Sequence, residues 1–274
     1  MNKIKKLLCL SLVFVMVLAL AACGGDDKGS DDSAASADDI VLTAYTQSAY
    51  PPFAYLDEND EFQGFDPEVM REIDKRLDGY TIDIQTLPWD AMFVAIDSGK
   101  GDMICNQVAI TEERQEKYTM TDPYFLASPS IIVAKGTEGI ESLEDLHGKT
   151  VWAQVGDSYT VFLEKYNKEH GDPIKLHYVE NQMLADAMMD LQIGKFDAIV
   201  NDPVMANTVI EEKNLDCKVV GEPVFTEAIG IVLQKNEKGE ELAKKINAII
   251  ADMKADGTLA RLSEEKTGGN YIPE

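Results

Sequence analysis

An arginine near the start of a short helix is the first residue of this sequence whose chemistry stands out. In "AITEERQEKY" (109–118), Thr111 is a good helix N-cap, and the polar residues after it predict the first turns of a helix. A helix N-terminus carries partial positive charge, which favours Glu112 and Glu113 but disfavours the cation of Arg114. A guanidinium binds a carboxylate through two parallel hydrogen bonds and keeps its charge. Arg114 is therefore either an anion-binding group, helped by the helix end, or a solvated arginine paired with a neighbouring glutamate.

A carboxylate at the end of an apolar segment is the second candidate for binding chemistry. The segment "FDAIVND" (196–202) predicts a buried strand that ends at Asp202, directly before Pro203. Open α/β sheets present ligand-binding groups at the carboxyl ends of their strands, so Asp202 is placed to pair with a cationic group. The same position is typical of a helix N-cap, and the two roles are compatible. Asp197, earlier in the segment, is expected to be structural.

Patterns for a metal site or for covalent catalysis are missing from the sequence. The three histidines form no metal-binding motif, and no Ser-His-Asp or Cys-His set is recognisable. The acidic run "DENDE" (57–61) lacks the glycine and the distal glutamate of an EF-hand, so it predicts a solvated hairpin tip rather than a calcium site. Cys105 lies in an apolar run and is expected to be a buried thiol, and a disulfide with Cys217 is not favoured. We expect no cofactor, no metal ion and no enzymatic activity.

The first 22 residues have the organisation of a secretion signal. Three lysines precede an apolar core, "LLCLSLVFVMVLAL", which is too short for a stable membrane span. The tetrapeptide "LAAC" resembles the bacterial lipobox, in which the cysteine is lipidated after cleavage; an ordinary cleaved signal is the alternative. The acidic residues that follow lack apolar periodicity, which is typical of a flexible tether. We expect a signal peptide at 1–22 and a lipidated Cys23 with its tether at 23–39, holding the remaining chain outside the cytoplasmic membrane.

The charge of the chain excludes nucleic acid as a partner. Its formal net charge is −24, and loss of the signal lysines makes the mature chain more acidic still. Such a surface repels phosphate groups. The part of the chain from about residue 40 to residue 274 is long enough to bury a large core or two lobes.

Short β-rich runs alternate with amphipathic helical patterns in the mature chain, which favours an α/β fold. Asp66, followed by Pro67, is expected to cap the first long helix. Two helices are followed by similar segments, "GKGDMICN" and "GKFDAIVND", so one α/β architecture is expected to occur twice. Strands are expected at 40–47, 80–87, 101–108, 130–135, 150–155, 175–180, 196–202, 217–222 and within 225–235, with a hairpin at 53–66. Helices are expected at 67–77, 89–100, 158–170, 183–195, 203–213, 237–254 and 256–265.

The order of five longer segments resembles a known family. These segments are "YPPFAYLDENDEFQGFDPEVM", "WDAMFVAIDSGKGD", "AITEERQEKYTMTDPYF", "SLEDLHGKTV" and "GKFDAIVNDPVMA". In this order they are similar to the polar amino-acid family of extracellular solute-binding proteins of ABC transporters, bacterial solute-binding protein family 3. The resemblance covers essentially the whole chain after the tether, and "ICNQVAITEER" together with "WDAM" is similar to the cystine-binding branch.

The resemblance implies an α/β, periplasmic-binding-protein type II fold. Such a fold has two lobes, each with a central sheet flanked by helices, joined by two crossing hinge strands with the ligand between them. Lobe 1 would combine residues 40–128 with residues 226–274, and lobe 2 would comprise residues 129–225.

The resemblance also assigns roles to four residues. Arg114 matches the arginine that pairs with the ligand carboxylate, and Asp202 matches the carboxylate that receives the ligand ammonium group. Tyr50 and Trp89 match aromatic walls against the ligand side chain, because aromatic rings supply a large contact area. Simple packing in a core is the alternative for each aromatic residue.

At other positions the sequence departs from the family. Ala109 replaces a Ser or Thr whose hydroxyl donates to the ligand carboxylate, although the backbone N–H of Ala109 is still a donor. In "QVGDSY", Asp157 stands at a threonine position, and we expect it to cap the helix that begins at Ser158 or to face a cationic group of the ligand. Gln47 stands where several members that bind basic amino acids or glutamine carry Asp. Gln154 and Ser158 complete the expected contacts in this segment.

The uncharged side chains bear on the identity of the ligand. Gln47, Asn106 and Gln107 would be uncharged partners, which favours a polar or sulfur-containing amino acid such as cystine. A cationic ligand is the alternative, because of Asp157 and the acidic surface.

The leading hypothesis is a monomeric, membrane-tethered receptor that captures a free amino acid by hinge closure and delivers it to an ABC permease and its ATPase. An enzyme similar to cyclohexadienyl dehydratases is one alternative, because the same fold supports both functions, and Asp157 would then be its general acid. A ligand-sensing lipoprotein is the other.

Overall fold

The computed structural model describes residues 39–180 and 182–274. The signal peptide, Cys23 and all but the last residue of the tether expected from the sequence lie outside these residues. No helix in the described ranges is long and apolar enough to cross a membrane.

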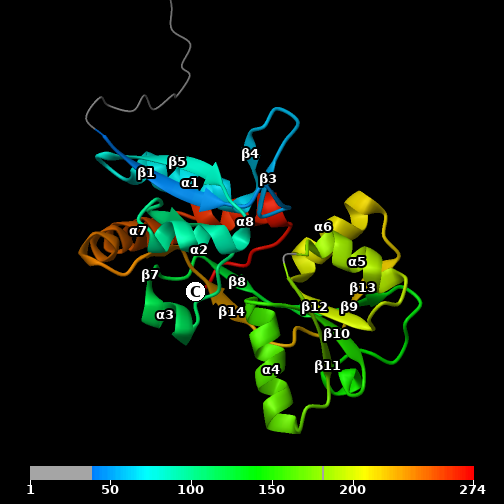
Figure 1. Cartoon of the computed structure of the whole chain (residues 1–274). Helices are drawn as coiled ribbons and strands as arrows, with labels where there is room; N and C mark the ends of the chain where they lie inside the picture. The colour runs from blue at the N-terminus through cyan, green and yellow to red at the C-terminus, as the bar shows by residue number, and fades with distance from the viewer. Residues whose placement is uncertain (1–38, 181) are drawn as a thin grey trace, which may run out of the picture. The chain divides into compact units, whose positions relative to one another are not determined.

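The first of two five-stranded sheets has the order β5-β1-β6-β15-β7 (Figure 1). Strand β1 is parallel to β5 and β6, whereas β15 is antiparallel to β6 and β7. The strands are β1 (Ile40–Thr46), β5 (Tyr80–Thr86), β6 (Met103–Ile104), β7 (Tyr118–Met120) and β15 (Val232–Gln234). Four helices pack on this sheet: α1 (Phe65–Arg76), α2 (Trp89–Asp97), α7 (Glu237–Ala255) and α8 (Thr258–Thr267).

Side-chain alternation along these strands explains why helices cover both faces. Ala44, Met103 and Leu233 belong to the buried cluster that contains the apolar residues of α1, α7 and α8. Their neighbours Tyr45 and Ile104 belong to a second cluster with Met92 and Ile96 of α2. Successive residues of a strand point to opposite faces, so a sheet that is apolar on both sides needs helices on both.

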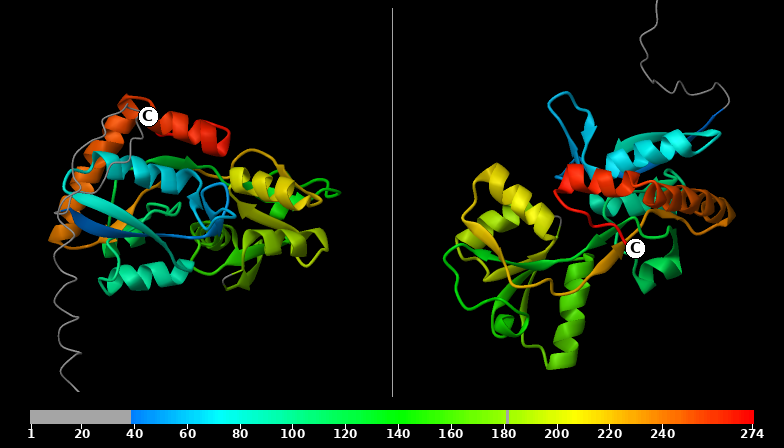
Figure 2. Two further views of the ribbon diagram at one scale, coloured as in Figure 1. Left: turned by 90° about the horizontal axis from the view of Figure 1, so that it is seen from above. Right: turned by 180° about the vertical axis from the view of Figure 1, so that it is seen from behind.

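The second sheet has the order β11-β10-β12-β9-β13 and follows the same rule. Ile132, Trp152 and Ile199 belong to the cluster that contains α5 and α6, whereas Ile131 and Val151 belong to the cluster that contains α4. These helices lie on opposite sides of the sheet (Figure 2). The strands are β9 (Ser130–Ala134), β10 (Thr150–Gln154), β11 (Lys175–Val179), β12 (Ala198–Asn201) and β13 (Cys217–Val220). The helices are α4 (Ser158–His170), α5 (Leu184–Gln192), α6 (Pro203–Lys213) and the short 3-10 turn Glu144–Leu146.

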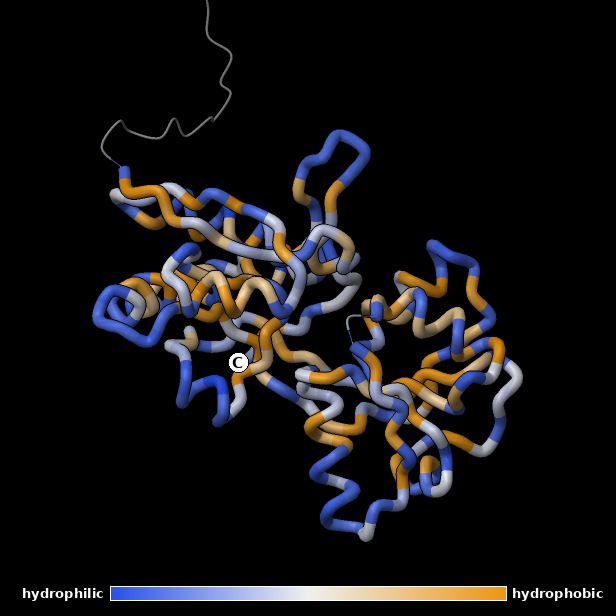
Figure 3. The backbone as a smooth tube through the Cα atoms, viewed as in Figure 1, coloured by the Kyte–Doolittle hydropathy of each residue, from blue (hydrophilic) through white to orange (hydrophobic). Residues whose placement is uncertain are grey.

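Two antiparallel strands connect the parts that contain the two sheets. Strand β8 (Phe125–Ala127) leads from the first sheet to the second, and β14 (Glu227–Ile229) returns beside it, with Glu227 opposite Ala127. The smaller elements are α3 (Glu112–Lys117) and the strands β2 (Ala49–Tyr50), β3 (Ala54–Leu56) and β4 (Phe62–Gln63). The tip of the β3–β4 hairpin is hydrophilic, as the "DENDE" run predicts (Figure 3). The predicted α/β architecture of two sheets flanked by helices and joined by two strands is confirmed.

The expected repeat has a structural basis in one turn that occurs in both sheets. In the first, the backbone N–H of Asp102 donates to the carbonyl of Thr43 (2.9 Å), and the Asp102 carboxylate accepts the N–H of Thr43 (2.9 Å). In the second, Asp197 and Thr150 make the same two bonds at 2.7 Å each. Each aspartate therefore fixes the start of one strand against a neighbouring strand, which confirms the structural role expected for Asp197.

Two local expectations need correction. Helix α1 begins at Phe65 with Gly64 as its N-cap residue, so Asp66 does not cap it. Asp66 is fully buried, and its carboxylate accepts hydrogen bonds from the side chains of Gln107 and Tyr124. These distant contacts outweigh the local tendency of an aspartate before a proline to cap a helix. The run 101–108 forms a strand only at Met103–Ile104. The run 225–235 contains strands as expected, β14 and β15. At Gly230, between β14 and β15, an added Cβ would lie 2.9 Å from the side chain of Ile110.

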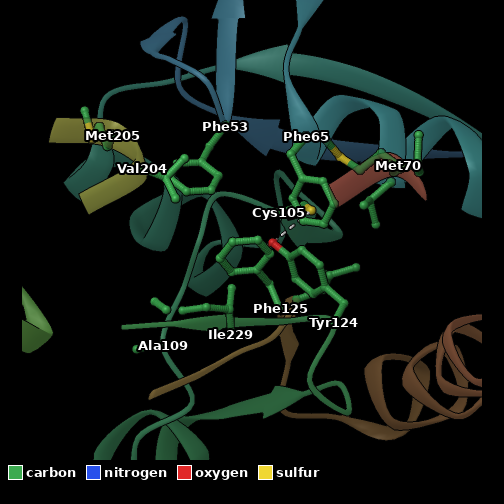
Figure 4. Close-up of a cluster of buried hydrophobic side chains, with 14 of the residues drawn as sticks. Phe53, Phe65, Met70, Cys105, Ala109, Tyr124, Phe125, Val204, Met205 and Ile229 are labelled. Atoms are coloured by element: carbon green, nitrogen blue, oxygen red, sulfur yellow. Dashed lines mark hydrogen bonds between the residues drawn. The ribbon is translucent and has the colours of Figure 1, made fainter. Parts of the chain in front are cut away.

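An aromatic cluster packs against the joining strand β8 (Figure 4). Phe125 of β8 lies 5.1 Å from Phe65 and 5.5 Å from Phe53, measured between ring centroids, and Phe65 stacks on Tyr124 at 6.0 Å. The Cys105 thiol lies 3.5 Å from the Tyr124 hydroxyl. Cys105 and Cys217 are both buried free thiols, which confirms the expectation for Cys105.

Candidate functional site

A cavity lies where the carboxyl ends of strands from both sheets face each other, with about 700 Å³ of empty space that is partly open to solvent. Gln47 follows β1 and Asn106 follows β6, whereas Gln154 ends β10 and Asn201 ends β12. Parallel strands of α/β sheets present ligand groups at these ends. The full lining is Gln47, Tyr50, Trp89, Asn106, Gln107, Arg114, Trp152, Gln154, Asp157, Ser158, Tyr159, Gln182, Met183, Leu184, Asn201, Met205 and Glu227.

The cavity gathers most of the site residues proposed from the sequence. Those that line it are Gln47, Tyr50, Trp89, Gln107, Arg114, Gln154 and Ser158. Ala109 and Asp202 do not line the cavity. The Ala109 carbonyl accepts from Arg114 and the Asp202 carboxylate accepts from Met205, and both donor residues line it. Cys23 lies outside the described residues. In the described ranges no cluster of three His, Cys, Asp or Glu side chains could hold a metal ion.

Arg114 is presented to the cavity by the short helix α3. The Thr111 hydroxyl accepts the N–H of Arg114 at 3.2 Å, as expected for an N-cap. One guanidinium nitrogen donates to the carbonyl of Ala109 (2.9 Å), and the other lies 3.5 Å from the carbonyl of Gly156 across the cavity. The guanidinium carbon lies 5.6 Å from the Trp89 ring centroid, within range of a cation–π interaction. These contacts hold the guanidinium in place without neutralising it.

No carboxylate of the described chain forms an ion pair with Arg114 within 4.0 Å. The structure therefore does not show the surface pair with Glu112 or Glu113. Burial lowers the pKa of Arg114, and the nearby charges of Asp157 and Glu227 oppose that shift. Arginine keeps its proton in proteins, so Arg114 is a partly desolvated cation whose remaining donors are available to an anion.

Asp202 caps α6 with one of its two carboxylate oxygens. Its Oδ1 accepts the backbone N–H groups of Val204 (2.8 Å) and Met205 (3.2 Å). Both of these hydrogen bonds are to Oδ1, and Oδ2 makes none in the described chain. The residue is 3% exposed. Burial raises the pKa of Asp202 to about 6. The predicted cap is thus confirmed, and it leaves one oxygen for a further donor.

Glu227 is the charged group of the cavity that sequence reasoning missed. It lies on β14, and the hydroxyl of Ser158 donates to its Oε1 at 2.9 Å. Burial raises the pKa of Glu227 to about 7, and the neighbouring charge of Asp157 contributes to the rise. The one sequence feature that could have indicated Glu227 is that it is the single charged residue of the largely apolar run "FTEAIGIVL".

Asp157 has the capping role expected from its position before Ser158. Its Oδ1 accepts the N–H of Tyr159 at 3.3 Å, at the first turn of α4. Burial raises the pKa of Asp157, and the charge of Arg114 lowers it. Asp157 and Glu227 thus form an acidic pair around Ser158 in the cavity wall.

Neighbouring side chains orient two of the amides that line the cavity. The Nδ2 group of Asn106 donates to Gln47 at 3.0 Å, while its Oδ1 accepts the N–H of Gln47 at 2.7 Å. The Nε2 group of Gln107 donates to Asp66 at 2.8 Å, which leaves the Gln107 carbonyl oxygen as an acceptor. The Oε1 atom of Gln154 is buried and has no partner in the described chain.

Replacing Asp66 tests whether the hydrogen bonds that its carboxylate accepts stabilise the wall of the cavity. The Asp66 carboxylate accepts both the Gln107 amide and the Tyr124 hydroxyl (2.9 Å). Asp66→Ala removes the acceptor of the fully buried Tyr124 hydroxyl and of the half-buried Gln107 amide. The unpaired Tyr124 hydroxyl should lower the free energy of unfolding by about 1–3 kcal/mol. Asp66→Asn keeps an acceptor oxygen and should lower it by less. Urea unfolding of both variants measures the difference, and equal losses would contradict this role.

Comparison with known proteins gives a consistent result. The sequence model of "Bacterial extracellular solute-binding proteins, family 3" matches residues 42–268. The probable amino-acid-binding protein YxeM of Bacillus subtilis is 34% identical over 254 residues, covering 93% of this chain and 92% of that protein. The L-cystine-binding protein TcyJ of Escherichia coli K12 is 31% identical over 231 residues, 84% of each chain.

A solved structure shows the same fold. It comes from a study of glutathione import via GshT and the cystine ABC importer TcyBC of Streptococcus mutans. It superposes with a TM-score of 0.77 at 28% identity, covering 86% of this chain and 98% of the other. The type II periplasmic-binding-protein fold expected from the sequence is thereby confirmed.

Proposed function

Because the chain belongs to the bacterial extracellular solute-binding proteins, family 3, we propose that it captures a free polar amino acid between its two lobes and delivers it to an ABC permease. Arg114 would bind the ligand carboxylate and Asp202 its ammonium group, while Tyr50 and Trp89 contact the side chain. Gln47, Gln107, Gln154, Ser158 and the N–H of Ala109 would complete the polar contacts.

One observation carries this proposal. Arg114 lines the cavity with donors that form no ion pair in the described chain, and Met205, which donates its backbone N–H to Oδ1 of Asp202, lines the same cavity. A cation in the wall and an anion directly behind it match the two ends of an amino-acid zwitterion. Closing the walls around it would exclude water and strengthen both interactions.

The organisation of the chain completes the proposal. We assign residues 40–128 and 226–274 to lobe 1 and residues 129–225 to lobe 2, with β8 and β14 as the hinge. The family is extracellular, and lipidation at Cys23 would anchor the receptor to the membrane that carries the permease and its ATPase. The receptor would act as a monomer without a cofactor. A sensing role would use the same binding event.

The enzyme alternative depends on Asp157 as a general acid. In the structure this carboxylate caps α4, and the relatives reported above are named as binding proteins. We therefore propose binding without turnover. Conversion of prephenate or arogenate by the purified protein would contradict that proposal.

A panel of candidate ligands tests the receptor function. The protein is unfolded in guanidinium chloride and refolded to remove bound ligand, and its thermal midpoint is measured with each standard amino acid, cystine, ornithine, citrulline and glutathione. A ligand at a thousand times its Kd adds about 4 kcal/mol of stability, which raises the midpoint of a chain this size by several degrees or more. A flat panel on well-folded protein would contradict the proposal.

A further inference from the structure

We propose that Asp66, which does not line the cavity, is a positioning residue of the ligand site. It orients the side-chain amide of Gln107 so that the carbonyl oxygen of this amide accepts an N–H group of the bound amino acid. This inference rests on the proposed function and deepens it, because it assigns the polarity of one ligand contact and names the residue that sets it.

The backbone of Gln107 is the first argument. Its φ of 49° lies in the left-handed region, which is unfavourable for residues other than glycine. The other non-glycine residues with positive φ in the described ranges are Asp60, Asp172 and Asn214. Short Asp and Asn side chains tolerate this conformation, whereas glutamine has no such preference. Backbone strain of this kind persists where the surrounding structure requires it, and it clusters at ligand sites.

Contacts on both sides hold Gln107 in this conformation. Before it, the side chain of Asn106 exchanges two hydrogen bonds with Gln47. After it, the carbonyl of Val108 accepts the N–H of Gly230 at 3.0 Å. Gln107 follows β6 and lines the cavity, so the fold places this side chain at the ligand site despite the strain in its backbone. We therefore infer that the side chain contributes to binding.

The carboxylate of Asp66 fixes which end of the Gln107 amide it contacts. Oδ1 of Asp66 accepts Nε2 of Gln107 at 2.8 Å and the Tyr124 hydroxyl at 2.9 Å, and both Asp66 and Tyr124 are fully buried. Burial raises the pKa of Asp66 to about 7, while hydrogen bonds from Tyr124 and Gln107 lower it. At pH 8 the group is therefore mainly a carboxylate, which has no donor. The amide can bind it only through Nε2, and Oε1 is left for another partner.

The carbonyl oxygen of Gln107 is an unused acceptor of the site. Gln107 is half-buried, and its Oε1 atom accepts no hydrogen bond in the described chain. This atom is accessible, unlike Oε1 of Gln154, which is buried without a partner. An α-ammonium group has three N–H donors, so it needs acceptors in addition to the free oxygen of Asp202. The oriented oxygen of Gln107 supplies such an acceptor in the same cavity.

A double-mutant cycle measures whether Asp66 acts on binding through Gln107. Isothermal titration calorimetry at pH 8 uses as its probe whichever standard amino acid or cystine raises the thermal midpoint of the wild type most. Gln107→Met keeps the length of the side chain but removes its amide, so affinity should fall about tenfold or more. In Asp66→Asn the new amide can donate to Oε1 of Gln107 as well as accept from Nε2. The orientation is then no longer fixed, and affinity should fall about fivefold or more.

The double variant separates positioning from a structural role. We expect it to bind as tightly as Gln107→Met alone, within about twofold, because Asp66 has nothing to orient once the amide is gone. Losses that multiply would show a structural role and overturn the inference. Unchanged affinity in Gln107→Met would also overturn it and leave the receptor standing, whereas a wild type that binds no amino acid would overturn both proposals. Asp78→Asn, an exposed position just after α1, is the control and should change nothing.

The pH dependence of the Gln107→Met loss is a second readout that needs no substitution at Asp66. Protonated Asp66 can donate to Oε1 of Gln107, which occupies the acceptor. Tyr50, Tyr124 and Cys105, the titratable side chains near Asp66, have pKa values raised by burial and stay neutral. The ratio of wild-type to Gln107→Met affinity should therefore fall from about tenfold at pH 8 to less than about threefold at pH 5. Other groups of the cavity titrate in both proteins and cancel in this ratio. A constant ratio would show that the charge of Asp66 does not orient the amide and would overturn the positioning role.

Discussion

Arg114→Ala is expected to weaken amino-acid binding strongly while leaving the protein folded. The guanidinium is partly desolvated, donates to the Ala109 carbonyl, and forms no ion pair within the described chain. A ligand carboxylate would be its counter-ion, and removing one partner of a buried charge pair costs about 2–5 kcal/mol. Isothermal titration calorimetry should therefore show affinity reduced by about 30-fold to several thousand-fold.

Two further variants separate charge from geometry at this position. Arg114→Lys keeps the cation but loses the planar fork that binds both carboxylate oxygens, so its affinity should lie between those of the wild type and Arg114→Ala. Arg261→Ala removes an exposed arginine that pairs with Glu265 on α8 and should leave affinity unchanged. Wild-type affinity in Arg114→Ala would refute the carboxylate role.

Local signals in the sequence were enough to predict several functional features. Thr111 caps α3 and Asp202 caps α6 because N-cap chemistry depends on the residues immediately following. Asp202 also follows a buried strand, a pattern that places it near the ligand edge of a sheet. The Asp102 and Asp197 turns could be recognised as a repeat because both use the same short Gly-Lys-x-Asp pattern.

Features that depend on distant contacts could not be predicted in this way. Asp66 has the local sequence of a cap, but Tyr124 and Gln107, about 40 to 60 residues away, hold its carboxylate instead. Glu227 acquires its role because β14 returns beside β8 and brings it to Ser158, 69 residues earlier in the chain. Neither contact can be inferred from residue type and spacing along the chain. Both become visible only when the two sheets are assembled.

Asp202→Asn is expected to weaken ligand binding and, above pH 7, to stabilise the ligand-free protein. Burial raises the pKa of Asp202 from 3.8 to about 6, so the folded state holds this proton more tightly than the unfolded state does. The stability from this group is fully present below pH 4 and is lost as pH rises through 6. Asparagine does not ionise, yet its side-chain oxygen still caps α6. The variant should therefore gain up to about 3 kcal/mol at pH 8, from a shift of about two pKa units.

The two effects together distinguish a binding carboxylate from a structural one. A ligand ammonium needs ionised Asp202, so wild-type affinity should rise between about pH 5 and pH 7, and this part of the rise should disappear in Asp202→Asn. Affinity at pH 7.5 should fall by about 30-fold or more, while Asp252→Asn, an exposed position on α7, changes neither property. Urea unfolding and calorimetry across this range measure both. A variant that is less stable at pH 8 with unchanged affinity would show that Asp202 serves only to cap α6. Opposite changes in stability and affinity are expected of a carboxylate that stays unpaired and buried until an ammonium group reaches it.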